Sequence, residues 1–276
     1  MKTATKILTL CTLHFSLTFG NGGGPPPPPL FVNSKITGSP HQAPLFLADT
    51  NNVTIFTQLS FYTPSSIDGK IEVDGTSIVS AADDNYKNLN WEMPSAAFNA
   101  GISIKVWKSL GIFYTLKMDS RENGLALSGS DLGLSFSMFR DKDVRARLDL
   151  GLTYLNMDME TTLLKQSDSS YSKKTENDNG FGSFAALTVC TAFEDLTINP
   201  FLQASYCILP LFNFDWATDR GISSTITTFT LTPGITYRIS NNILIMLGGS
   251  FTIPSDIENI SSEVIYSGFL QANFLL

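Results

Sequence analysis

The stretch Val144-Arg-Ala-Arg-Leu-Asp-Leu-Gly-Leu-Thr-Tyr154 decides the fold, because its side chains alternate between two kinds. Even-numbered positions carry apolar side chains, whereas odd-numbered positions carry Arg, Asp, Gly or Thr. Successive side chains of a β-strand point to opposite faces, so this alternation gives a strand one apolar face and one polar or small face.

The same alternation recurs from residue 53 to the C-terminus and predicts ten strands. Many of them run ten residues or more, which is the length that a tilted strand needs to cross a bilayer. The other nine predicted strands are 53–63, 96–107, 110–119, 130–139, 180–193, 196–209, 225–239, 243–253 and 263–276.

The connections between these strands alternate between short and long. Short turns are predicted at 108–109, 140–143, 194–195 and 240–242, and long loops at 64–94, 120–129, 157–179, 210–224 and 254–262. The long loops hold most of the acidic residues. This pattern predicts an all-β fold: a closed up-and-down antiparallel transmembrane β-barrel of about ten strands, with loops 64–94 and 157–179 outside the cell. The turn at 194–195 places Cys190 opposite Asn199.

Aromatic residues gather on the apolar face where the strands meet the long loops. Such belts are typical of the two interfaces of a membrane. A soluble barrel or sandwich with its apolar face inward has the same alternation, but the strand lengths, the loop asymmetry and the aromatic belt favour the membrane. The predicted lipid-interface girdle comprises Phe61, Phe98, Tyr154, Phe181, Tyr206, Phe229, Phe251 and Tyr266.

Over about residues 53–276 the chain resembles bacterial outer-membrane β-barrel proteins. The last strand, Val264 to Leu276, is similar to the C-terminal assembly signal of that class, with Tyr266, Leu270 and Phe274 on the lipid face, but it ends in leucine rather than an aromatic residue. The resemblance implies location in the cell outer membrane and outer-membrane lipids as partners. It also raises the possibility of an enzyme, since ten-stranded barrels include His-dependent outer-membrane proteases.

The segment before the predicted barrel has two parts. Residues 1–20 read as a secretory signal peptide, because Lys2 and Lys6 precede an apolar run that ends in Thr-Phe-Gly. Residues 21–52 begin with three glycines and the five prolines 25–29, which predicts a Gly/Pro-rich periplasmic linker. Residues 53–276 form the predicted barrel domain.

Composition and residue placement exclude several functions. A net charge of −7 with 16% charged residues argues against nucleic-acid binding. Both histidines, His14 and His41, precede the predicted barrel, so we expect no catalytic residue, no metal site, no cofactor and no enzyme activity. The pair Asp83-Asp84 could serve as metal ligands or in acid/base chemistry, but adjacent carboxylates in a loop are more often surface charge. Cys190 and Cys207 are predicted to be free thiols that face the lumen.

The predicted lumen carries basic residues near the short-turn end of the strands. The candidates for a constriction are Lys105, Arg145, Arg147, Asp149 and Arg238. Two hypotheses remain open at this stage. One is a non-enzymatic surface protein, whose long acidic loops 64–94 and 157–179 contact an extracellular or envelope partner. The alternative is a narrow, porin-like channel that favours small anions.

Overall fold

The computed structural model describes residues 30–45, 52–64, 66–72, 86–121, 124–140, 143–165, 170–191, 197–211, 224–255 and 264–276. No helix in this part of the chain is long and apolar enough to cross a membrane. Ten strands build the main body. They are β2 (Val53–Tyr62), β5 (Ala96–Lys105), β6 (Leu110–Arg121), β7 (Gly124–Arg140), β8 (Val144–Lys165), β9 (Ser170–Thr191), β10 (Ile198–Leu211), β11 (Ser224–Ser240), β12 (Ile243–Ser255) and β13 (Ile265–Leu275).

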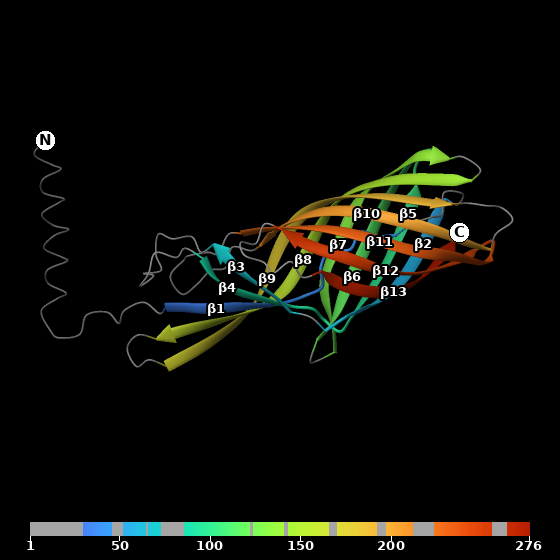
Figure 1. Ribbon diagram of the computed structural model, residues 1–276. Helices are drawn as coiled ribbons and strands as arrows, with labels where there is room; N and C mark the ends of the chain where they lie inside the picture. Colours follow the sequence, from blue (N-terminus) through green and yellow to red (C-terminus); the bar gives the residue numbers. More distant parts are fainter. Residues whose placement is uncertain are drawn as a thin grey trace, which may run out of the picture.

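These ten strands form a closed antiparallel barrel. Each pairs with its neighbour in the order β8-β7-β6-β5-β2-β13-β12-β11-β10-β9, and β9 pairs with β8 to close the ring. All of these pairings are antiparallel, so the prediction of a ten-stranded up-and-down barrel is confirmed. Figure 1 shows the strands running side by side along the barrel, with the C-terminus at the end opposite β1, β3 and β4.

The register departs from the sequence prediction at two turns. Between β11 and β12, the turn at 240–242 predicts Ile239 opposite Ile243; Tyr237 pairs with Ile245 in that frame, but a register shift between Arg238 and Ser240 places Ser240 opposite Ile243. Between β9 and β10, Cys190 pairs with Phe201 rather than with Asn199. The predicted pairing of Cys190 with Asn199 is therefore wrong, and the turn predicted at 194–195 lies outside the described residues. A shift of two residues leaves every side chain on its predicted face.

Three further strands extend the wall at the long-loop end. β1 (Leu30–Thr37) pairs antiparallel with Asp158–Leu164 of β8, and β4 (Tyr86–Glu92) lies parallel to β1 and antiparallel to β3 (Ser66–Glu72). One edge of β8 pairs with two strands: its first part pairs with β7 and its last part with β1. We call β1, β3, β4 and the outer parts of β8 (157–165) and β9 (170–179) the platform.

Three of the predicted long loops contain regular structure. The predicted loop 157–179 is mostly the outer hairpin of β8 and β9, in which Met157 pairs with Asp178. The predicted loop 64–94 contains β3 and β4, and the predicted loop 120–129 is replaced by strands that run to Arg121 and start again at Gly124. These three loop assignments are therefore corrected. The sequence predicted loops there because the strands are polar and show no alternation of apolar side chains.

The structure describes residues 30–45 of the predicted Gly/Pro-rich periplasmic linker 21–52. Leu30–Thr37 forms β1, and residues 38–45 belong to no strand and enter the barrel. Residues 1–29, with the predicted signal peptide and the five prolines, lie outside the described residues. The same holds for Asp83 and Asp84.

The barrel is polar inside and apolar outside. Buried positions along the strands carry Thr, Ser, Gln, Asn and paired charges, for example Gln58, Thr115 and Thr188. The alternate positions carry large apolar side chains that are exposed, such as Leu132 at 55% and Leu152 at 63%. This distribution is the inverse of a water-soluble domain, in which apolar side chains are inside.

Inward-facing phenylalanines lie over glycines of the neighbouring strand. An added Cβ at any of these glycines would lie less than 3 Å from the ring of its partner, so each ring occupies the space of the missing side chain. The five cross-strand pairs are Phe56 with Gly101, Phe113 with Gly133, Phe184 with Gly151, Phe201 with Gly234 and Phe269 with Gly248.

Candidate functional site: the barrel interior and its N-terminal segment

Residues 38–45, which we call the lumen segment, cross the interior of the barrel. Before it, β1 pairs with β8 at the platform end. After it, β2 begins at the opposite end, where the amide of Val53 donates to the carbonyl of Leu276. Pro40, His41, Ala43, Pro44 and Leu45 are all buried. Because proline lacks an amide donor, two prolines in eight residues disfavour a β-ladder with the wall.

At the platform end the lumen segment is held by Asp119 of β6 and by Trp91 of β4. The amide and the hydroxyl of Ser39 donate to the two carboxylate oxygens of Asp119, at 2.9 and 2.8 Å. The indole Nε1 of Trp91 donates to the carbonyl of Gly38 at 3.0 Å, and Trp91 is fully buried. These bonds fix the point at which the chain enters the barrel.

The imidazole of His41 lies in a buried charged cluster. Its Nε2 is 3.3 Å from Asp131 Oδ1, and Lys117 Nζ is 2.8 Å from the same oxygen. The side chains of His41 and Asp131 are completely buried, and that of Lys117 is 6% exposed. On its other side the imidazole contacts the ring of Phe184, with ring centroids 4.6 Å apart. The lumen segment, β6 and β7 therefore meet at one carboxylate.

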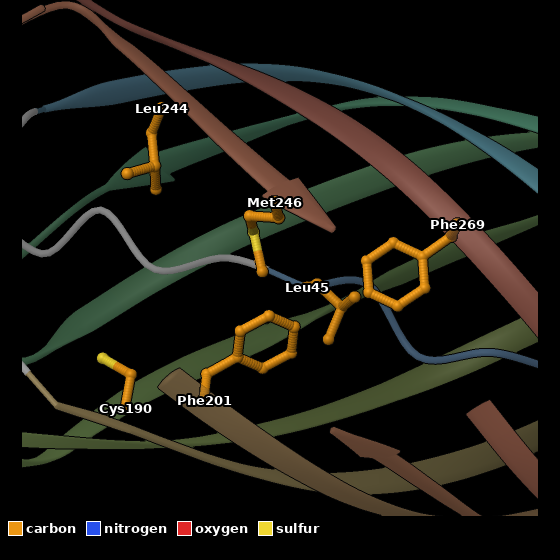
Figure 2. Packing of buried hydrophobic residues seen from close by; sticks show 6 residues of the cluster. All are labelled: Leu45, Cys190, Phe201, Leu244, Met246 and Phe269. Atoms are coloured by element: carbon orange, nitrogen blue, oxygen red, sulfur yellow. The ribbon is translucent and has the colours of Figure 1, made fainter. Parts of the chain in front are cut away.

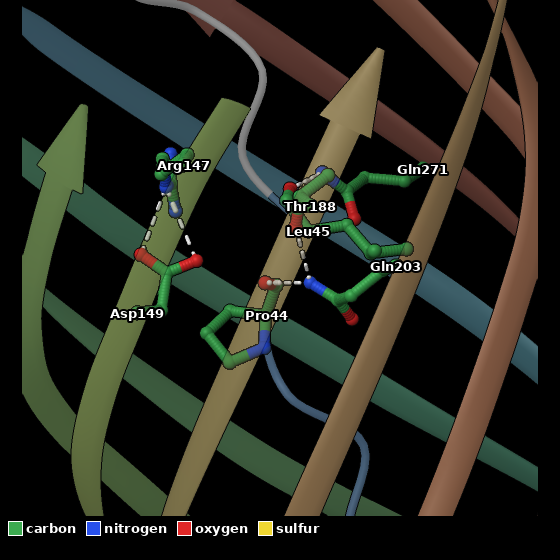
Figure 3. A network of polar contacts seen from close by, with 7 residues as sticks. All are labelled: Pro44, Leu45, Arg147, Asp149, Thr188, Gln203 and Gln271. Carbon is green, nitrogen blue, oxygen red and sulfur yellow. Dashed lines mark hydrogen bonds and ion pairs between the residues drawn. The ribbon is translucent and has the colours of Figure 1, made fainter. Parts of the chain in front are cut away.

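Glutamine side chains hold the rest of the lumen segment. Gln42 Nε2 donates to the hydroxyls of Ser250 and Ser267 at 2.7 and 2.8 Å. From the wall, Gln203 Nε2 donates to the carbonyl of Pro44 at 3.1 Å, and Gln271 Nε2 donates to the carbonyl of Leu45. Figure 3 shows the side chains of these two wall glutamines directed at the segment.

The lumen segment ends in an apolar collar. Leu45 is 2% exposed and forms one cluster with inward-facing residues of β9, β10, β12 and β13. Figure 2 shows the leucine lying among these side chains inside the barrel. Its partners in the collar are Cys190, Phe201, Leu244, Met246 and Phe269. Cys190 and Cys207 are buried free thiols, as predicted.

The structure brings together only part of the predicted cationic constriction. Arg147 Nε lies 2.8 and 3.1 Å from the two carboxylate oxygens of Asp149, and both residues are buried (Figure 3). Lys105 and Arg145 are half-buried at the turn end, and Arg238 is exposed at its rim. The positive charge of Arg147 is thus balanced within the wall, while the other three lie toward the opening.

The predicted girdle residues all lie on the outer face of the barrel. Phe61, Phe181, Tyr206, Phe229, Phe251 and Tyr266 are exposed, and Phe98 and Tyr154 are half-buried. Neighbouring strands pair some of these rings, with centroids 5.2 Å apart for Tyr154 and Phe181 and 5.6 Å apart for Phe251 and Tyr266.

Exposed large apolar side chains occur on every one of the ten barrel strands. An unbroken apolar ring around a closed barrel with a polar interior suits a lipid environment and not water. The protein is a transmembrane β-barrel of the outer-membrane class. Its location is the cell outer membrane.

Comparisons with known proteins agree in fold only. No family model and no curated protein matches the chain. The outer membrane protease OmpT from Escherichia coli is 10% identical, with 84% of this chain and 99% of that chain covered at a TM-score of 0.46. A FadL homologue from Pseudomonas aeruginosa is 8% identical, with 82% and 90% covered at 0.38. LpxR from Salmonella typhimurium is 10% identical, with 81% and 100% covered at 0.34. Likeness at this level carries no argument about activity.

The functional residue that sequence reasoning missed is His41. It was excluded as a catalytic base because it precedes the barrel in sequence, yet the fold places it inside the barrel beside Asp131. No periodicity marks residues 38–45. The available signals were the isolated inward charges Lys117 and Asp131, which a buried site must neutralise.

The placement of the platform predicts a labelling pattern. In whole cells, a membrane-impermeant maleimide is expected to label Tyr171→Cys and Lys35→Cys, because β9 and β1 both extend beyond the barrel at the platform end. Ser109→Cys, at the opposite end, is expected to react only after permeabilisation. The chain without added cysteines is the control, since Cys190 and Cys207 are buried. Labelling of Lys35→Cys only after permeabilisation would contradict the path of the N-terminal segment and support a periplasmic linker.

Proposed function

We propose that the protein is a non-enzymatic outer-membrane protein whose barrel is closed at rest by its own N-terminal segment. In this proposal the platform is the surface that contacts an extracellular or envelope partner. The observation that carries the proposal is the path of residues 38–45 through the interior of the barrel. Each of the five residues 41–45 is either buried or hydrogen-bonded to the wall.

The geometry of His41 supports a structural role rather than catalysis. A general base has to reach the proton of a substrate, directly or through one water. Both the imidazole and its carboxylate partner are completely buried inside the barrel. Lys117 occupies the same carboxylate oxygen, so the cluster is arranged as an internal ion pair. We therefore assign it to holding the lumen segment.

The platform supports a surface role. The regions 64–94 and 157–179 carry 6 acidic against 2 basic residues and 5 acidic against 3 basic residues. Part of this charge is paired internally, as in Lys173 with Glu160 at 2.7 Å and Arg121 with Asp158 at 2.6 Å. The excess of carboxylates suits an extracellular or envelope partner that presents cations, besides the outer-membrane lipids around the barrel.

An open anion-selective pore is less well supported. Of the four basic candidates, Arg147 is paired with Asp149 and Arg238 is exposed at the rim. An anion that passed the barrel would also meet Asp119, Asp131 and Asp149 on the inner wall. These carboxylates cancel much of the field that the basic residues create.

Planar-bilayer recording tests the closed barrel. The purified full-length protein, inserted and shown to be folded by its faster migration before boiling, is expected to give no steady conductance steps in 1 M KCl. The physical reason is that the lumen segment lies inside the barrel and packs Leu45 against the apolar collar. Regular ion-conducting steps from the unmodified chain would overturn the proposed resting state and favour the channel.

A further inference from the structure

We propose that the lumen segment is a removable plug, and that its withdrawal turns the barrel into a path for small, uncharged polar solutes. This inference rests on the closed barrel proposed above and adds a transport activity to it. The occupant of the opened lumen is defined by chemistry: a neutral molecule whose hydroxyl or amide groups exchange hydrogen bonds with the wall.

The barrel is complete without the plug. Each of the ten barrel strands pairs with two barrel neighbours, so the lumen segment contributes no strand to the wall. Its contacts run through side chains, such as Gln42 to the wall serines and Gln203 to the carbonyl of Pro44. Single side-chain hydrogen bonds exchange with water far more readily than a cooperative backbone ladder. The wall can therefore keep its shape when the segment leaves.

The wall carries more polar groups than the plug satisfies. Six hydroxyls are buried and have no hydrogen-bond partner within the described part of the chain. They belong to Ser60, Thr115, Ser128, Ser135, Thr153 and Thr228. A wall built only for permanent closure would be apolar or fully paired, because an unpaired buried hydroxyl is unfavourable. Hydroxyls that line an interior are instead what a hydrated solute path requires.

The charges inside the barrel indicate which solutes would pass. Lys117 lies against Asp131 and Arg147 against Asp149, so these two pairs stay balanced after the plug and its His41 have gone. Asp119 at the platform end and Lys105 and Arg145 at the turn end add charge of both signs to the opened interior. Around them lie Gln58, Asn99, Gln203 and the buried threonines. A wall of amides and hydroxyls with balanced charge discriminates weakly between anions and cations. It can exchange hydrogen bonds with a neutral polar solute.

Leu45 is the element that closes the path. Its neighbours Cys190, Phe201, Leu244, Met246 and Phe269 belong to β9, β10, β12 and β13, so in this proposal the leucine and this side of the wall form the apolar constriction. A hydrophobic constriction of this kind excludes water and ions when it is filled. A polar residue at position 45 would be buried against the collar without a partner, which favours release of the segment.

Leu45→Asn in the full chain tests the plug. In liposome swelling with arabinose, a neutral pentose, we expect at least a tenfold faster rate for Leu45→Asn than for the unmodified protein. Leu45→Met is the matched control, since methionine fills the collar with similar volume and should stay closed. In bilayers under a KCl gradient, Leu45→Asn is expected to show a reversal potential near zero, as a path without charge preference requires.

Each outcome decides one part of the proposal. A folded Leu45→Asn protein that stays closed to arabinose overturns the removable plug, while the resting-state proposal stands if the unmodified protein is also silent. Anion-selective currents overturn the neutral solute class. Should Leu45→Asn fail to fold, Ser39→Ala with Gln42→Ala is the second variant. It removes the hydroxyl bond of Ser39 to Asp119 and the bonds of Gln42 to Ser250 and Ser267, and it keeps the collar and the backbone amide bond of residue 39 to Asp119. That variant is expected to open, and its closure would overturn the plug.

Discussion

Asp131→Asn is expected to lower the free energy of unfolding of the barrel by about 3–5 kcal/mol, the loss measured when one partner of a buried ion pair is removed. The carboxylate is completely buried and lies 2.8 Å from Lys117 Nζ. Asparagine keeps the shape but removes the charge, so the ammonium of Lys117 would remain buried without a counter-charge. The measurement is urea unfolding in detergent micelles, followed by the loss of the fast-migrating band on unboiled gels.

A double substitution separates the ion pair from simple packing. Asp131→Leu combined with Lys117→Met removes both charges and fills the space, and it is expected to recover most of the lost stability, because apolar replacement of a buried pair is often neutral or stabilising. If Asp131→Asn alone is as stable as the unmodified chain, the interior is hydrated enough to solvate Lys117. The buried cluster would then not hold the lumen segment.

The barrel itself could be predicted from the sequence because its environment imposes a strict pattern. Lipid on one side and a polar interior on the other force an alternation of period two, and this marked all ten strands. Their ends moved outward where polar pairing continues beyond the membrane, as in β8, which runs to Lys165 instead of Tyr154. The predicted final strand and its outward Tyr266, Leu270 and Phe274 are also found.

The platform could not be predicted because its strands show no alternation of apolar side chains. In the outer hairpin, polar residues such as Thr162, Lys173 and Asp178 stand at both even and odd positions. Pairing alone defines these strands, and β1 reaches them across more than a hundred residues of sequence. Such contacts are tertiary, and a local reading of composition takes the segments for loops.

The interior was predictable only where partners are close in sequence. Arg147 and Asp149 are two residues apart on one strand, so the alternation already places them on the same inner face. The cluster of His41, Lys117 and Asp131 combines the N-terminal segment with two barrel strands. The sequence shows two unexplained inward charges there, but not the imidazole that completes the cluster.

At several glycines that face the lumen there is no space for a side chain, and the alternation of the sequence does not indicate this. They read as small residues on the polar face, yet five of them accommodate the ring of a phenylalanine from the neighbouring strand. At Gly133 the space is restricted twice, since an added Cβ would lie 2.5 Å from Phe113 Cζ and closer still to the backbone oxygen of Leu150. A ring can rotate away, but the backbone of β8 is fixed by its ladder.

Gly133→Ala is therefore expected to lower the free energy of unfolding by about 1–3 kcal/mol or more, the usual range for overpacking. Gly268→Ala is the matched control on β13, because its added Cβ meets nothing closer than 3.9 Å. Both changes remove the same backbone freedom from the unfolded chain, so their difference isolates the clash. Equal urea midpoints for the two variants would show that β7 and β8 can separate locally. The phenylalanine and glycine pairs would then not set the spacing of the wall.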